Sequence, residues 1–204
     1  MRARRGLRFV ATTALLVAAR ALDAWSTWVA TPDLRLETNP LQRLLHFGWG
    51  GLLLMNAVVI AILVYAAWRA AFRPPALPTE PGFDLPAFIG HYWFSSSQPR
   101  SLVQATYWLP ADRRVRWAFI GGPGAALVIA ASALVAVWNL AVARGVVISP
   151  RAGHLWVAAF WVAVLLGLGG AVRLFLVRAY TRYSRYSRVA HGPAGSRVKP
   201  AAAQ

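Results

Sequence analysis

Long apolar stretches dominate the hydrophobic pattern of this chain. Four of them are almost free of charge: Phe9–Ala30, Leu44–Trp68, Ala118–Ala143 and Leu155–Val177. A helix of about 20 apolar residues crosses a bilayer core of about 30 Å, and each stretch is long enough to do so. None shows the alternation of a barrel strand. The pattern therefore predicts an all-α membrane protein, a four-transmembrane-helix bundle, and disfavours a soluble helical core.

The cationic side chains are distributed unevenly between these stretches. Of 22 lysines and arginines, seventeen lie before the first stretch, between the second and third, or at and beyond the end of the fourth. The two other loops hold four, and Arg20 lies inside the first stretch. Cytoplasmic loops of membrane proteins carry such an excess, so both termini and the central loop are expected in the cytoplasm. Topology thus accounts for the net charge of +16, which in a soluble chain would suggest nucleic acid.

The pattern divides the chain into five segments. They are a basic N-terminus (1–8), a first helix pair with a short outer loop (9–68), a loop rich in proline, aromatic residues and arginine (69–117), a second helix pair (118–177), and a basic, partly disordered tail (178–204). Residues 1–21 also resemble a cleavable signal peptide. We expect them to be retained, because apolar character resumes after Asp23.

The central loop holds two aromatic stretches, Phe83–Phe94 and Ser101–Leu109, that are too short to span a membrane. Tryptophan and tyrosine favour the headgroup zone, so short interfacial helices are expected here, with a protein-binding surface as the alternative. The tail repeats tyrosine, a hydroxyl residue and arginine over 180–188, which suggests an anchor extending the fourth helix or, less favoured, an RNA-binding tract. Anionic lipid headgroups are the expected partners of Arg113, Arg114, Arg116, Arg182, Arg185 and Arg188.

Polar residues interrupt the first apolar stretch. Arg20 and Asp23 are spaced to pair on one helical face, and Thr27 follows one turn later, within reach of Asp23. Asn56, inside the second stretch, is expected to hydrogen-bond another helix. A carboxylate inside the membrane is a candidate functional position. The expected polar cluster at the outer end of the bundle contains Arg20, Asp23, Thr27, Glu37, Asn39, Pro40 and Asn139.

Four of the residues near that end could support catalysis or bind a metal: Asp23, Glu37, His46 and His154. Two carboxylates and two imidazoles can hold zinc, whose bound water can act as a nucleophile. However, the sequence contains no close-spaced ligand motif such as His-Glu-x-x-His. Hydrogen-bonded packing is therefore the favoured interpretation. The absence of cysteine excludes disulfides, thiolate catalysis and cysteine-based metal centres.

A family resemblance appears at the same residues. Asp23-Ala-Trp-Ser26-Thr27, followed by Glu37-Thr-Asn39-Pro40, resembles the Asp-x-x-[Ser/Thr]-Thr … Glu-x-Asn-Pro signature of an uncharacterised family of small multi-pass prokaryotic membrane proteins. The match covers the first two apolar stretches. It implies that these residues form one unit in a prokaryotic cytoplasmic (inner) membrane protein, and it carries no established activity.

Three functions follow from these observations. The leading hypothesis is a non-enzymatic accessory or scaffold subunit of a membrane complex, without a cofactor, that binds a protein partner or a second copy of itself. The first alternative is a metal-dependent hydrolase or transferase, with the four candidate residues at its extracytoplasmic side. The second is a small oligomeric transporter or channel, with Arg20 and Asp23 on its path.

Overall fold

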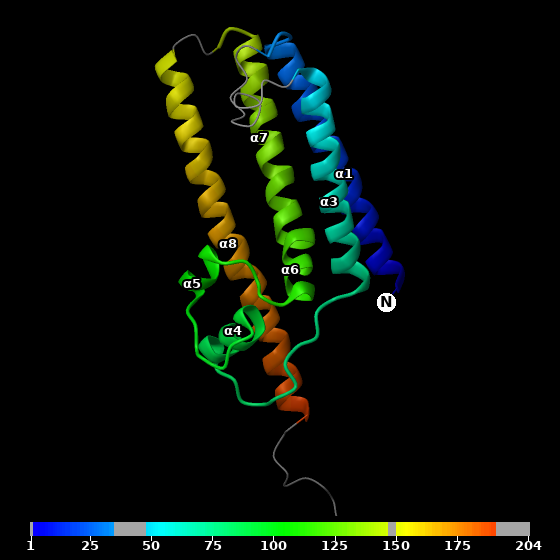
Figure 1. Ribbon diagram of the computed structural model, residues 1–204, viewed down its shortest axis with the longest axis vertical. Helices are drawn as coiled ribbons and strands as arrows, with labels where there is room; N and C mark the ends of the chain where they lie inside the picture. Colours follow the sequence, from blue (N-terminus) through cyan, green and yellow to red (C-terminus); the bar gives the residue numbers. More distant parts are fainter. Residues whose placement is uncertain (1, 35–47, 147–149, 191–204) are drawn as a thin grey trace, which may run out of the picture.

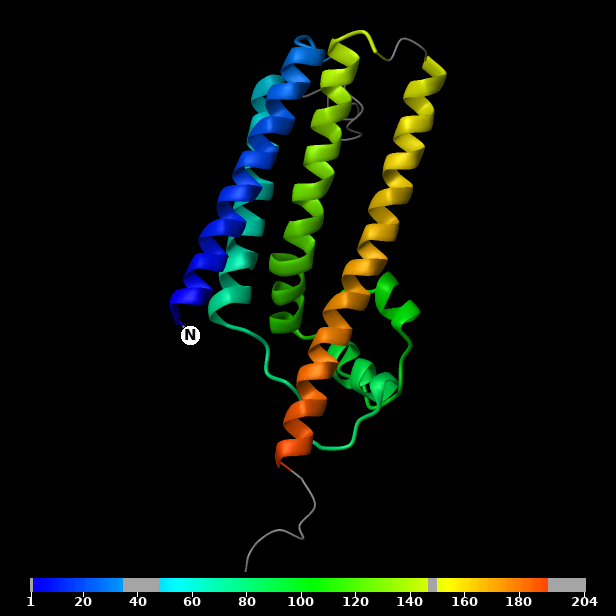
Figure 2. The same cartoon turned by 180° about the vertical axis from the view of Figure 1, so that it is seen from behind.

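The computed structural model describes residues 2–34, 48–146 and 150–190, and every regular element within them is helical. The long helices α1, α3, α7 and α8 run along the molecule, and the short helices α4 and α5 lie near one end (Figures 1 and 2). The helices are α1 (Arg2–Ala30), α3 (Trp49–Phe72), α4 (Leu85–Phe94), α5 (Leu102–Tyr107), α6 (Arg113–Phe119), the π-helical turn η1 (Ile120–Gly124), α7 (Ala125–Ala143) and α8 (Pro150–Ala190).

Three helical segments of the described chain are long and apolar enough, by length and composition, to cross a membrane. They are Trp49–Phe72, Arg113–Ala143 and Gly153–Arg188. The prediction of a helical protein with membrane-spanning segments is therefore supported by three of the four expected stretches. The helix α1 is not one of the three; its first turns are basic, and Arg20 and Asp23 lie within its apolar part.

Two helices extend beyond the stretches that the sequence predicts. The third begins at Arg113 rather than Ala118, because the Asp112 side chain accepts hydrogen bonds from the backbone N–H groups of Arg114 and Val115 at 2.7 and 2.8 Å. The wider turn η1 then accommodates Pro123, which lacks an N–H group, without ending the helix. The fourth continues past the end of its apolar stretch at Val177 to Ala190, in line with the helical extension expected for the tail.

Small residues allow close contact between α3 and the α6–η1–α7 segment. At Gly121 an added Cβ would lie 2.1 Å from the backbone oxygen of Ala66, so only glycine permits this approach. Further along, Ala125, Ser132 and Ala136 are buried on one face of α7. These small residues form a face that permits close helix packing, and α1 packs against α7.

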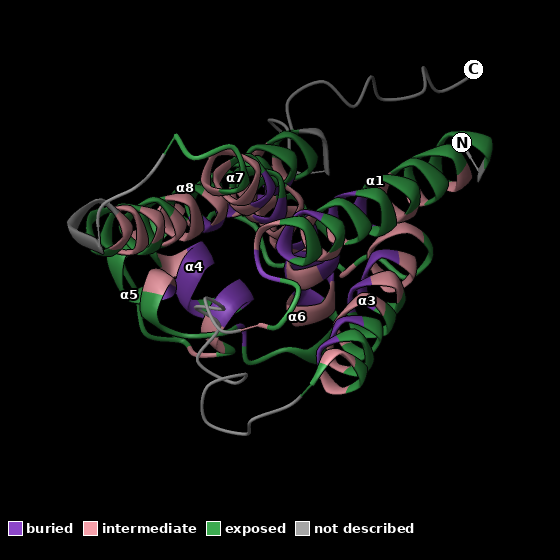
Figure 3. Ribbon diagram, turned by 90° about the horizontal axis from the view of Figure 1, so that it is seen from above, coloured by how far each residue is buried: buried purple, intermediate pink, exposed green. Residues whose placement is uncertain are grey.

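Residues 85–111 are here called the cap; they comprise α4, α5, the loop between them and the residues just after α5. The cap packs against the C-terminal half of α8. Their shared core contains Phe88, Ile89, Tyr92, Trp93, Ala105, Val115, Phe119, Val172, Leu176, Ala179 and Tyr183. Seen from above, buried residues are concentrated in α4, while much of α1 and α8 is exposed (Figure 3).

Tyr92 is one of the buried side chains of this core. Burial raises the pKa of its phenol, and the negative charge of Asp112 raises it further, whereas the positive charge of Arg182 lowers it.

This core changes the interpretation of the first aromatic stretch. A helix forms at each of the two predicted sites, α4 and α5. Phe88 and Trp93 of α4, however, have no exposed surface and lie inside the protein rather than among headgroups. The reason is the length of α8, which continues beyond its apolar stretch and presents Ala179 and Tyr183 to the cap.

The tail tyrosines are also part of this packing. The Tyr183 hydroxyl donates a hydrogen bond to the backbone oxygen of Glu80 at 2.8 Å and accepts one from the backbone N–H of Phe83 at 2.9 Å. Tyr180 packs edge-on against Phe88, whereas Tyr186 is exposed. The helical extension expected from the sequence is present, and it holds the linker before α4 as well as the cap.

Candidate functional site

Arg20 is the centre of a polar network between α1, α3 and α7. Its Nη1 donates hydrogen bonds to Asp23 Oδ2 at 2.7 Å and to Ser132 Oγ of α7 at 3.1 Å. Its Nη2 donates to Asn56 Oδ1 of α3. The predicted ion pair between Arg20 and Asp23 is present, and the two side chains are 19% and 15% exposed. One guanidinium thus links three helices.

A second set of hydrogen bonds lies one turn further along α1. The Asn139 Nδ2 of α7 donates to Ser26 Oγ at 3.2 Å and to Thr27 Oγ1 at 3.0 Å. Ser26 Oγ donates to the backbone oxygen of Asp23 at 2.8 Å. The sequence places Thr27 within reach of Asp23, but in the structure its hydroxyl accepts a hydrogen bond from Asn139 instead. Ser26 and Thr27 are both buried, so these bonds provide the hydrogen-bond partners that water would provide at the surface.

We call these seven residues the polar network: Arg20, Asp23, Ser26, Thr27, Asn56, Ser132 and Asn139. A charge inside the membrane is costly unless it is paired and hydrogen-bonded. The network meets most of this requirement, although Arg20 Nε is buried without an acceptor among the described residues. Each interhelical hydrogen bond of the polar network connects α1 with α3 or with α7.

The predicted catalytic and metal-binding set is only partly described. Its members Glu37 and His46 lie outside the described residues, as do Asn39 and Pro40 of the predicted polar cluster. His154 is exposed near the start of α8. Within residues 2–34, 48–146 and 150–190, no group of three histidine, aspartate or glutamate side chains could hold a metal ion. The convergence of Asp23, Glu37, His46 and His154 therefore stays a prediction.

The helices α7 and α8 meet near His154 through aromatic side chains. Trp138 and Trp156 stack with ring centroids 4.6 Å apart and an angle of 4° between their planes. On the other side of the bundle, Trp25 and Trp28 of α1 line a shallow apolar groove with Trp49 of α3. The indole N–H of Trp49 donates to the backbone oxygen of Pro32 at 2.7 Å. Apart from this hydrogen bond the contacts are aromatic and apolar, and none of these residues adds an acid or a base to the polar network.

Sequence reasoning missed the role of Arg20 as the common partner. It treated Asp23 as the central residue and Arg20 as its neutralising neighbour, although Asn56 was correctly expected to bond another helix. It assigned Ser26 and Ser132 no hydrogen bonds. A signal was available in the spacing: Arg20, Asn56 and Ser132 lie 10, 12 and 11 residues from the predicted outer ends of the first three apolar stretches, at Ala30, Leu44 and Ala143.

Comparison of the chain with protein-family models, with curated proteins and with solved structures finds no match.

Proposed function

We propose that the protein is a four-span integral membrane protein of a prokaryotic cytoplasmic membrane, with both termini and the cap in the cytoplasm. Three segments have the required length and apolar character, and α1 packs beside two of them. Pairing of Arg20 with Asp23 lowers the cost of placing α1 in hydrocarbon. The start of α1, the end of α3, the start of α6 and the cap lie toward one end of the molecule (Figure 1), where arginines are abundant.

Within that membrane its proposed role is that of a non-enzymatic accessory or scaffold subunit. The observation that carries this role is the polar network. Its interhelical hydrogen bonds join α1 to α3 and α7, so its polar groups serve to fix the helices relative to one another. A rigid unit of this kind suits a protein that positions others. It is also consistent with the absence of known catalytic motifs from the sequence.

The helix α8 is the proposed contact surface for the partner. Of its most apolar 18 residues only 6% are buried within the protein, against 22% for α3 and 17% for the α6–η1–α7 segment. Packing of α8 against the rest is densest near its cytoplasmic half, through the cap. Glycine at 170 is exposed with open space around it, which permits close approach of another helix.

Site-specific photo-crosslinking in intact membranes tests this role. A photoreactive residue replaces Leu166 on the exposed face of α8 in one variant and Leu54 on the exposed face of α3 in the matched control. The proposal predicts one protein adduct of defined mass from position 166 and only lipid adducts from position 54. Lipid adducts alone from both positions would contradict the scaffold role, and an adduct with a second copy would make the partner the protein itself.

Elemental analysis separates the scaffold from the metal-dependent alternative. Protein purified without chelator is expected to contain no stoichiometric zinc, manganese or iron. A stoichiometric metal that is lost in Glu37→Gln and His46→Ala would instead support the hydrolase or transferase built on Asp23, Glu37, His46 and His154.

A further inference from the structure

The helix α5 and the turn that follows it carry an exposed apolar patch. Val103, Tyr107, Trp108 and Leu109, here called the α5 tip, are 67%, 78%, 69% and 62% exposed. The neighbouring helix α4 has a similar composition but buries Phe88 and Trp93 completely. One aromatic segment of the cap is therefore sealed inside the protein, while the other is left uncovered.

The position of the α5 tip is fixed by hydrogen bonds from the sealed segment. The indole N–H of Trp93 donates to the backbone oxygen of Trp108 at 2.8 Å, and the backbone N–H of Ala111 donates to the backbone oxygen of Trp93 at 2.8 Å. At the other end of α5, Ser101 and Gln104 form a reciprocal capping box. These bonds hold the apolar side chains on the outside of the cap.

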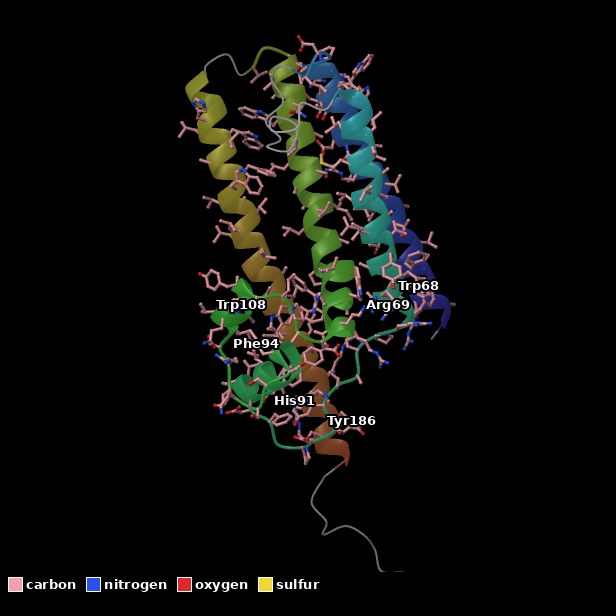
Figure 4. All side chains as sticks on the ribbon, viewed as in Figure 1. Trp68, Arg69, His91, Phe94, Trp108 and Tyr186 are labelled. Atoms are coloured by element: carbon pink, nitrogen blue, oxygen red, sulfur yellow. The ribbon has the colours of Figure 1, made fainter. Side chains whose placement is uncertain are left out.

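The α5 tip lies at the cytoplasmic end of the apolar part of the bundle. The Thr106 methyl group is 3.7 Å from where a Cβ on Gly169 of α8 would be. Gly169 precedes Arg173, the first arginine near the end of the apolar stretch, by four residues, or about 6 Å along a helix. Figure 4 shows Trp108 at about the height of Trp68 and Arg69 at the end of α3, with His91 and Tyr186 lower in the view, toward the C-terminal end of α8.

Cationic side chains flank the tip on both sides. Arg100 precedes α5, and Arg113 and Arg114 begin α6 after the N-cap residue Asp112; all three arginines are exposed. An apolar and aromatic tip bordered by arginines fits the boundary between acyl chains and anionic headgroups. We propose that the α5 tip inserts into the cytoplasmic leaflet beside the spans, and that α4 does not. The inference rests on the proposed membrane orientation.

The natural absence of cysteine allows a direct test of depth. Single cysteines replace Val103 and Leu109 in the tip, Val58 on the exposed face of α3 as the membrane reference, and Ser97 in the exposed α4–α5 loop as the aqueous reference. Each carries a nitroxide in full-length protein reconstituted into phosphatidylethanolamine–phosphatidylglycerol vesicles. Collision with oxygen, which concentrates in lipid, is compared with collision with a water-soluble nickel chelate.

The oxygen-to-nickel collision ratio at 103 and 109 is expected to be several-fold higher than at 97 and to approach the ratio at 58. Equal ratios at 103, 109 and 97, with a high ratio at 58, would overturn insertion of the tip and leave the placement of α3 across the membrane intact. Exclusion of both reagents from 103 and 109 would overturn it as well, because a protein would then cover the patch. A low ratio at 58 would refute the placement of α3 across the membrane itself.

Discussion

The contacts of Arg20 show which interactions can be predicted from helical spacing and which cannot. Its pairing with Asp23 follows from three-residue separation on a helix, and the sequence predicts it. Its bonds to Asn56 and Ser132 join residues 36 and 112 positions away, and no local rule supplies them. They depend on the relative height of three helices, which the sequence leaves open. The same limit applies to Asn139, whose partners Ser26 and Thr27 are 113 and 112 positions away in the sequence.

Removing the charge of Asp23 tests the structural role of the polar network. Asp23→Asn leaves Arg20 with only neutral partners among the described residues, and removing one member of a buried ion pair costs about 3 kcal/mol. Unfolding in mixed detergent micelles measures the loss. Glu80→Gln removes a carboxylate from an exposed position and is expected to have no measurable effect. Equal stability of both variants would show that the network does not hold the helices together.

At the level of elements, the sequence predicts the long helices better than their ends. The third apolar stretch is predicted to start at Ala118, yet the helix begins at Arg113 and passes through Gly121-Gly-Pro-Gly124 as a π-helical turn. Aromatic content, in turn, does not distinguish α4 from α5, because tryptophan and tyrosine suit both a protein core and a membrane interface. Only the packing of α4 on α8 separates the two.

Two adjacent glycines offer a matched test of helix contact. In Gly121→Ala the new methyl group meets the Ala66 backbone, so α3 must move away, at a cost of about 1–3 kcal/mol. In Gly122→Ala the methyl group meets nothing within 4 Å, and stability is expected to stay equal or rise by up to about 1 kcal/mol. Thermal unfolding in detergent compares them. Similar losses in both variants would contradict the close contact at Gly121.

Tyr183 provides a second test, in the contact between the tail and the linker before α4. Tyr183→Phe leaves the Glu80 oxygen and the Phe83 N–H without their hydroxyl partner, a loss of about 1–3 kcal/mol. Faster hydrogen exchange at Phe83 and faster proteolysis of residues 73–84 are expected. Tyr186→Phe, which changes an exposed ring, is the control. Unchanged exchange in Tyr183→Phe would mean that the linker is held by other contacts.

For the whole molecule, apolar length and composition predict the helical membrane class, and charge distribution predicts its orientation. Two features could be predicted neither from apolar length nor from charge. One is the aromatic core of the cap, and the other is the low burial of α8 within its apolar part. Both depend on contacts between segments far apart in the sequence.

Orientation is tested by labelling with a membrane-impermeant maleimide. A cysteine at Val146, exposed at the turn after α7, is expected to react in intact cells. A cysteine at Ser97, in the cap, is expected to react only after the membrane is made permeable. The reverse pattern would place the cap outside the cell.

The mass of the protein in its native lipid environment tests the scaffold proposal most directly. Polymer-bounded discs cut from the membrane keep α8 and its neighbours together, and native mass spectrometry then weighs the contents. A scaffold subunit is expected in a complex of fixed stoichiometry, and replacement of Leu166 on α8 by tryptophan should weaken that complex more than the same replacement of Leu54 on α3. A solitary 22.2 kDa chain accompanied only by lipid would contradict the proposal.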